Sequence, residues 1–282
     1  MSDSASQIGL SQLKELWIHT GTACNLECPF CLEGSRPGDT RLERIKLTEI
    51  KPYLDEAARL DVERFGFTGG EPLIVKDIVK ILEYALSLRP CLVLSNGTAP
   101  LLKRLHQLQL LKQQAHPLSF RISIDYPDEQ RHDTARGWGN FARALEGLQL
   151  LYEQGFAISI ARQMDADEDA DAVQEAYRLL LRKTRLPEET RIVALPELGK
   201  LGTPSQRNDA GGFAKHPVKL MCSYSRMLLK RESKLRVYAC AFTDDDARFD
   251  LGSSLTEAIQ NRVCLQHQRC QQCLLHAASY SE

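Results

Sequence analysis

The chain has 282 residues, of which 43% are hydrophobic and 26% are charged, as in an ordinary globular protein. Its net charge of −1 gives no reason to expect nucleic acid or an anionic membrane as a partner. The polar N-terminus shows no signal peptide and no segment is long and apolar enough to span a bilayer, so we expect a cytoplasmic protein.

Short apolar runs and amphipathic segments alternate along the first two thirds of the chain, which predicts six strand–helix units. We expect strands at residues 16–20, 64–67, 91–94, 119–124, 156–160 and 191–193. We expect helices at residues 49–60 (with Thr48 as N-cap), 77–88, 100–113, 140–153 and 169–182. Such an order predicts a parallel sheet, open or closed into a barrel, with its chemistry at the carboxyl ends of the strands.

The alternation stops near residue 200, where we place the boundary between a first domain (1–200) and a second (201–282). Residues 201–216 are rich in Gly, Ser, Pro and Asn, which is typical of a linker. Beyond it we expect a hairpin and a short helix, at residues 226–240 with a turn at 232–233, and at 255–262 with Ser254 as cap. This part is small, so metal ligation by its cysteines would supply stability that burial does not.

Nine cysteines in one chain point to metal or redox chemistry, because disulfides are rare in a reducing compartment. Cys91 lies alone in an apolar run and is expected in the core. Cys24, Cys28 and Cys31 share one loop after the first expected strand. Three thiolates can hold three corners of an iron–sulfur cube and leave the fourth iron open to another ligand.

This Cys-x3-Cys-x2-Cys loop, followed by Gly-Gly-Glu-Pro at residues 69–72 after the second strand, resembles the radical S-adenosylmethionine (SAM) enzymes. The resemblance implies an α/β fold, a partial (β/α)6 TIM-like barrel. It also implies a [4Fe–4S] cluster held by Cys24, Cys28 and Cys31, with SAM on the open iron. In that family one electron from the cluster cleaves SAM to methionine and a 5′-deoxyadenosyl radical.

The glycine turn is assigned to SAM by its place in the family motif. Gly69 and Gly70 lack side chains, which lets backbone polar groups approach a ligand. Glu71 offers a carboxylate suited to the SAM ammonium group. Asn96 belongs to a Ser-Asn-Gly turn in the place of the family's Thr-Asn-Gly turn, so it is also a SAM-binding candidate.

A second run, from Ser123 to Gly137, resembles the Ser-x-Asp…His-Asp-x-x-Arg-Gly pattern of the peptide-modifying and twitch-bearing branches. By that resemblance Ser123 and Arg136 would hold the SAM carboxylate. Asp125 would contact the substrate, or cap the next segment instead. Phe30 would pack against the adenine, or serve as a local hydrophobic plug.

Some polar positions near the expected strand ends have weaker assignments. Tyr126 stands where the family usually has Gly, which changes the substrate side of the pocket. Arg162 and Glu197 follow expected strands and face either the active site or its structural rim.

The C-terminal cysteines Cys222, Cys240, Cys270 and Cys273 resemble the twitch domain, a shortened form of the SPASM domain. Four thiolates would close an auxiliary [4Fe–4S] cluster, and a structural zinc site is the alternative on the same ligands. Cys264 is the one cysteine that these assignments do not use. It is a substitute ligand, a small buried residue or a catalytic thiol that returns a hydrogen atom to a substrate radical.

These assignments lead to one expected function and two alternatives. The leading hypothesis is a radical SAM oxidoreductase that abstracts a hydrogen from a small molecule or peptide and passes an electron to the auxiliary cluster. The alternatives are an epimerase that uses a cysteine donor and a zinc-stabilised binding protein. A flavodoxin or ferredoxin would supply electrons. A GTP cyclase is disfavoured, because its Gly-x-Gly-Arg tail is missing here.

Overall fold

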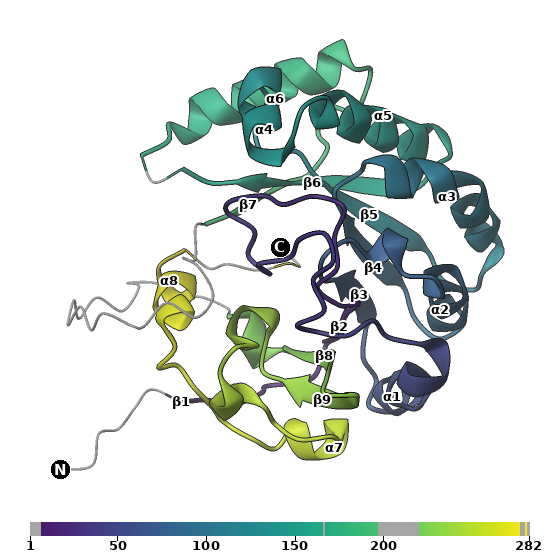
Figure 1. Cartoon of the computed structure of the whole chain (residues 1–282), viewed down its shortest axis with the longest axis vertical. Helices are drawn as coiled ribbons and strands as arrows, with labels where there is room; N and C mark the ends of the chain where they lie inside the picture. The colour runs from purple at the N-terminus through teal and green to yellow at the C-terminus, as the bar shows by residue number, and fades with distance from the viewer. Residues whose placement is uncertain (1–6, 166, 197–219, 277–279, 281–282) are drawn as a thin grey trace.

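The structure, a computed structural model, describes residues 7–165, 167–196, 220–276 and 280. Its centre is a curved eight-stranded sheet with the strand order β7-β6-β5-β4-β3-β2-β8-β9, and helices lie along its outer face (Figure 1). All neighbouring strands are parallel except β8 and β9. The strands are β2 (Glu15–His19), β3 (Arg64–Thr68), β4 (Cys91–Ser95), β5 (Leu118–Ser123), β6 (Ala157–Gln163), β7 (Ile192–Leu195), β8 (Ser225–Arg231) and β9 (Lys234–Tyr238).

The helices alternate with the strands β2 to β7, so the expected α/β fold with a parallel sheet is confirmed. They are α1 (Leu47–Arg59), α2 (Ile78–Leu86), α3 (Ala99–Leu110), α4 (Glu129–Arg136), α5 (Asn140–Glu153) and α6 (Ala170–Lys183). The sequence predicted five of them and missed α4, whose eight residues are too polar to show an apolar stripe. None of the described helices is long and apolar enough to cross a membrane.

The expected start of the first helix is wrong by two residues. Lys46, not Thr48, is the N-cap, and its backbone N–H donates to the Glu49 carboxylate at 3.0 Å. A glutamate three residues after the cap satisfies one of the free backbone donors at a helix start, and this fixes the boundary.

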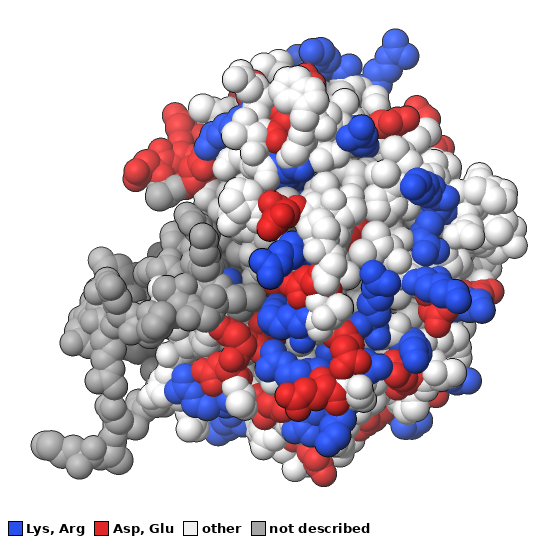
Figure 2. All heavy atoms as spheres, in the orientation of Figure 1, with Lys and Arg blue, Asp and Glu red and all other residues white. Residues whose placement is uncertain are grey.

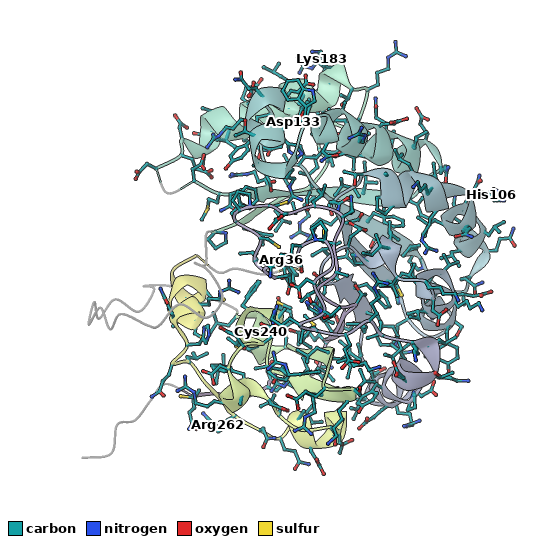
Figure 3. All side chains as sticks on the ribbon, viewed as in Figure 1. Arg36, His106, Asp133, Lys183, Cys240 and Arg262 are labelled. Carbon is teal, nitrogen blue, oxygen red and sulfur yellow. The ribbon has the colours of Figure 1, made fainter. Side chains whose placement is uncertain are left out.

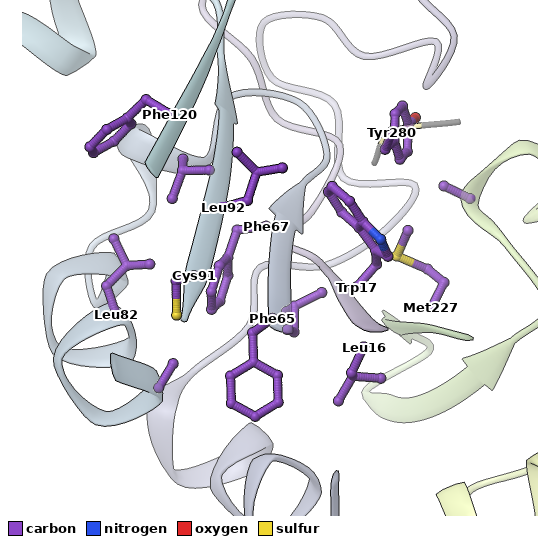
Figure 4. Packing of buried hydrophobic residues seen from close by; sticks show 14 of the residues in the cluster. Leu16, Trp17, Phe65, Phe67, Leu82, Cys91, Leu92, Phe120, Met227 and Tyr280 are labelled. Atoms are coloured by element: carbon purple, nitrogen blue, oxygen red, sulfur yellow. The ribbon is translucent and has the colours of Figure 1, made fainter. Parts of the chain in front are cut away.

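The core lies between the sheet and its helices, and a second packed layer lies inside the curve of the sheet (Figure 4). Gly66 on β3 is essential to that inner layer. A Cβ atom there would come within 2.4 Å of the Trp17 ring. The fully buried Trp17 packs in turn on Tyr280, with 5.2 Å between ring centroids.

The C-terminal part continues the sheet rather than forming a core of its own. Strand β8 pairs with β2, and the hairpin turn falls at Glu232 and Ser233 as expected, both with positive φ. Ser254 caps the short helix α7 (Leu255–Ala258), also as expected. Two elements were not foreseen, the helix α8 (Gln268–His276) and the strand β10 (Val263–Cys264), which pairs with β1 (Gln7–Ile8). The expected linker at 201–216 lies outside the described residues.

Candidate active site

The first three cysteines line one cavity at the carboxyl ends of the parallel strands. Two of their sulfurs face backbone donors: the N–H of Leu26 lies 3.4 Å from Cys24 Sγ, and that of Ser35 lies 3.4 Å from Cys31 Sγ. Burial raises the pKa of the Cys24 thiol to about 12 and also raises those of the other two thiols. Without a cation these thiols therefore stay protonated, and a metal would have to displace the protons.

Gly69 and Gly70 also line this cavity, and close packing is what requires glycine at both positions. A Cβ atom on Gly70 would lie 2.1 Å from the carbonyl oxygen of Ala23, and one on Gly69 would lie 2.8 Å from that of Gly21. The glycine turn therefore lies directly against the backbone that leads into Cys24. Because the two glycines have no side chains, the two loops can pack against each other and a ligand can approach the backbone.

Glu71 has a different environment from the one expected. Its carboxylate is buried and accepts hydrogen bonds from the N–H groups of Leu73 and Asn96, at 3.0 and 2.8 Å, and from the Ser95 hydroxyl at 2.9 Å. It is not one of the residues that line the cavity. Burial raises its pKa to about 7, although the hydrogen bonds oppose this. Glu71 thus joins the glycine turn to the Ser-Asn-Gly turn.

Asn96 lies on the cavity side of that junction. Its amide nitrogen donates to Asn25 Oδ1 at 2.9 Å, and it lies 3.9 Å from Cys24 Sγ. Its side-chain oxygen Oδ1 accepts hydrogen bonds from the backbone N–H and the hydroxyl of Thr98. The side chain is therefore held in place beside a cysteine that faces the cavity.

Asp125 and Arg136 form a buried ion pair in the cavity wall. The carboxylate contacts the guanidinium through both oxygens, with 3.2 Å between Nη2 and Oδ1. The expected partner of Arg136 was a ligand carboxylate, whereas in the structure its charge is matched by Asp125. This ion pair raises the pKa of Arg136, whose guanidinium lies 5.9 Å from the centre of the Phe30 ring.

His132 supports the same wall from behind. Its Nδ1 accepts from the backbone N–H of Asp125 at 3.2 Å, so this nitrogen carries no proton. Burial lowers the pKa of His132 to about 4, which keeps the ring neutral. The hydroxyl of Tyr177 donates to the carbonyl oxygen of Ile124 at 2.7 Å. Together these bonds fix the turn that presents Asp125.

Phe30 and Ser123 line the cavity as expected, and Arg162 lines it as well. Arg162 is bound by Glu168, with 2.7 Å between Nη1 and Oε2. The space that these residues surround is about 810 Å3, its open mouth included. Glu197 lies outside the described residues.

Sequence reasoning missed a buried hydrogen-bonded group on the opposite wall. Tyr280 lines the cavity, and its hydroxyl donates to Glu33, two residues beyond Cys31. His19 Nδ1 accepts from the N–H of Gly21, so its Nε2 carries the proton and donates to Glu33 at 2.9 Å. These bonds lower the pKa of Glu33 against the effect of burial. Nothing in the sequence indicates that residue 280 returns to residue 33.

The four C-terminal cysteines converge on a second, smaller cavity of about 340 Å3. Cys222 and Cys240 flank the β8–β9 hairpin, and α8 carries Cys270 and Cys273 one turn apart. Burial raises the pKa of Cys222 to about 12 and raises those of Cys240 and Cys270. Cys240 is labelled near the centre of the molecule in Figure 3. The two cavities are close, because Phe242 of the second packs on Tyr280 of the first, with 4.9 Å between ring centroids.

Neither of the two remaining cysteines lines either cavity. Cys91 is 1% exposed in the core, as expected. Cys264 lies on β10, where it pairs with Gln7, and it lines neither of the two cavities. The possible catalytic role of Cys264 therefore gains no support from its position.

Both cysteine groups fit the metal centres that the sequence led us to expect. The first group offers three sulfurs, with backbone N–H donors beside two of them, a pattern found around iron–sulfur clusters. The second offers four sulfurs around one small space, which suits a closed four-ligand site of iron–sulfur or zinc type.

Comparison with known proteins agrees with this geometry. The family model described as "Radical SAM superfamily" matches residues 18–180. The mycofactocin maturase MftC of Mycolicibacterium smegmatis is 30% identical over 172 residues, which is 58% of this chain and 42% of the relative. MftC of Mycobacterium ulcerans is 27% identical over 267 residues, with 83% of this chain and 70% of the relative covered. The chain thus spans less than half of the first of these relatives.

A solved structure shows the same fold. SuiB of Streptococcus suis, crystallised with S-adenosylmethionine, aligns with a TM-score of 0.67 over 90% of this chain and 67% of that one. The identity is 13%, so this likeness concerns the fold alone. SuiB has also been solved with the precursor peptide SuiA.

Proposed function

The chain belongs to the radical SAM superfamily, and on that premise we propose that it is an oxidoreductase that modifies a peptide by removing hydrogen from it. The observation that carries the proposal is the presence of two adjacent cysteine-lined cavities, one lined by three cysteines and the other by four. In the first, Cys24, Cys28 and Cys31 would bind three irons of a [4Fe–4S] cluster. That cluster supplies one electron, and SAM supplies the organic radical that removes the hydrogen.

The cavity walls are suited to hold SAM and a substrate. Gly69, Gly70 and Asn96 present polar groups beside Cys24, and Ser123 presents a hydroxyl on the wall that also holds Arg136. Arg136 is matched by Asp125, so a bound carboxylate would share the guanidinium with this aspartate. Phe30 offers an apolar face for a purine ring. The Asp125 carboxylate and the Tyr280 hydroxyl are the groups that we assign to the substrate side.

Cys222, Cys240, Cys270 and Cys273 would hold an auxiliary [4Fe–4S] cluster in a twitch-type second domain, residues 201–282. A closed cluster next to the first cavity can accept the electron that remains when a substrate radical becomes an oxidised product. This role favours oxidation over epimerisation. Epimerisation would require a hydrogen donor in the cavity, and Cys264 does not line it.

A peptide is the substrate class that the comparisons support best. The most similar curated proteins include maturases, and the structural neighbour SuiB binds a precursor peptide. A small molecule is the alternative. We also propose that a flavodoxin or ferredoxin supplies the electrons and that the protein works in the cytoplasm.

Anaerobic reconstitution followed by metal analysis tests the two metal sites. We expect about eight iron and eight sulfide per chain, as two cubanes require. A content of about four iron and one zinc per chain would show that the second site holds structural zinc. The proposed electron acceptor would then be absent. Zinc alone would contradict the whole proposal.

The reaction type is tested with candidate precursor peptides in deuterated water. Oxidation predicts SAM consumed in a fixed ratio to a product that has lost two hydrogens and gained no solvent deuterium. Deuterium at an inverted carbon would identify an epimerase instead.

A further inference from the structure

A groove on the outer surface lies directly behind the loop that carries Cys24. It encloses about 940 Å3, open space included, between the short 3-10 helix Pro72–Ile74 and the helix α3. The floor is apolar, with Leu73, Ile74, Ala99 and Pro100, and the rest of the lining is polar or basic: Asn25, Lys103, Arg104 and Gln107. None of these residues belongs to either cysteine-lined cavity.

The groove carries positive charge that none of the described acidic residues neutralises. Lys103 is exposed and forms no ion pair with any residue that the structure describes. Arg104 donates to the carbonyl oxygens of Leu73 and Val75, at 2.6 and 3.0 Å, and to Gln107, and all three partners are neutral. Figure 2 shows further Lys and Arg side chains on the side of the molecule where α2 and α3 lie.

A short path of hydrogen bonds joins this groove to the cysteine site. Asn25 lines the groove and directly follows Cys24 in the chain. Its side chain donates to the Thr98 hydroxyl at 3.0 Å, which ties it to the start of α3. It also accepts from Asn96, whose amide nitrogen lies 3.9 Å from Cys24 Sγ. One residue therefore contacts the groove on one side and the cavity wall on the other.

We propose that this groove is the docking site of an acidic, low-potential, one-electron carrier protein of the flavodoxin or ferredoxin class. The inference rests on the proposed function. Docking here would bring the carrier close to Cys24 while the cavity mouth stays free for SAM and substrate. In each encounter the carrier loses one electron and the cysteine-bound cluster gains it. Basic rim residues would steer an acidic partner, and the apolar floor would exclude water at the contact.

The experiment compares the reconstituted wild type with Lys103→Glu and with a control charge reversal, Lys183→Glu. Lys183 is also exposed, but it ends the helix α6 at the top of the view in Figure 3, away from His106, which marks the helix α3. The rate of cluster reduction is followed by stopped-flow absorbance with photoreduced flavodoxin at low salt, and separately with dithionite. Electron paramagnetic resonance of the reduced protein verifies that the cluster is intact.

We expect Lys103→Glu to slow reduction by flavodoxin about tenfold, because a rim charge acts on the association rate. High salt should abolish the difference from wild type. Reduction by dithionite and the resonance spectrum should not change, and Lys183→Glu should behave as wild type. Zero-length carbodiimide should also cross-link Lys103 to a carboxylate of flavodoxin.

Two results would overturn the inference. One is an equal flavodoxin rate in all three proteins. The other is a Lys103→Glu variant that loses product formation with dithionite as reductant, which would mark the groove as a substrate site. If wild type shows no cluster reducible by dithionite, the proposed function itself fails, and the spectrum distinguishes that case.

Discussion

At the scale of single residues, the cysteines differ in what their removal should do. Cys28 lines the first cavity, whereas Cys91 is a core residue that lines neither cavity. We expect Cys28→Ala to lower the iron content after reconstitution from about eight to about four per chain. Cys91→Ala is the matched control and should keep all of the iron. Equal iron in both variants would show that Cys28 is not a ligand.

Glu71 predicts a pH dependence. Its pKa in the folded protein is about 7, above the ordinary value of 4.5, because burial penalises the charge. Between these two values the folded state binds more protons than the unfolded state, so stability falls as pH rises. Urea unfolding between pH 6 and 8, followed by the fluorescence of the buried Trp17, measures this slope. In Glu71→Gln the free energy of unfolding should no longer fall between pH 6 and 7, whatever the absolute stability of this variant. An unchanged slope would assign the effect to other groups.

A family motif does not specify the contacts of the residues that it identifies. The pattern assigned Glu71 and Arg136 to the cofactor, and in the structure Glu71 holds two turns together and Arg136 pairs with Asp125. A motif records which residue types recur together, but it does not record what each side chain contacts.

At the scale of elements, the contact between the glycine turn and the cysteine loop is the feature most sensitive to substitution. A Cβ atom on Gly70 meets the backbone of Ala23, which has no flexible side chain to move aside. We expect Gly70→Ala to displace the loop that leads into Cys24 and to prevent assembly of the first cluster. Iron analysis of the purified protein measures this. Gly9→Ala, whose Cβ atom would be 3.8 Å from its nearest neighbour, should assemble normally.

The helix α4 could not be predicted from the periodicity of the sequence. It is short and polar, and its place is set by tertiary contacts of its own residues. Asp128 caps it, Asp133 accepts from the backbone N–H of Phe141 at 2.7 Å, and Arg136 reaches the cavity. The motif revealed these residue types without the helix, because a helix with little apolar surface leaves no periodic signal.

At the scale of the whole molecule, an ion pair between a partly exposed arginine and a buried aspartate joins the N-terminal loop region to the C-terminal part. Arg41 Nη1 donates to Asp244 Oδ2 at 2.7 Å, and Asp244 is fully buried. We expect Arg41→Met to lower the free energy of unfolding by about 3 kcal/mol, because it leaves a buried carboxylate without its cation. In the double variant Arg41→Met/Asp244→Asn the loss should be smaller.

Urea unfolding compares these variants with a surface control. Arg248 pairs with Asp246, and the Arg248 side chain is 61% exposed, so Arg248→Met should cost less than about 1 kcal/mol. If Arg41→Met costs no more than this control, the two parts are not joined through this pair. The pairing of β8 with β2 makes residues 220–276 a continuation of the first part, and this ion pair adds a second connection.

The order of the strands and helices from β2 to β7, α4 excepted, and the grouping of the first three cysteines could be predicted from sequence alone. Both depend on residues that are close in the chain. The strands and helices follow from the periodic spacing of apolar residues, and the grouping of the thiols follows from their close spacing on one loop. The hairpin turn at Glu232 and Ser233 and the cap at Ser254 are local features and were predicted for the same reason.

Only the tertiary structure decided what meets across long distances in the chain. It brought Tyr280 to Glu33, and it added β8 beside β2. It also paired Cys264 with Gln7, outside the lining of both cavities, and placed Asn25 between a cavity wall and an outer groove. Such contacts follow from the packing of the whole sheet and its helices, and no local pattern of residues encodes them.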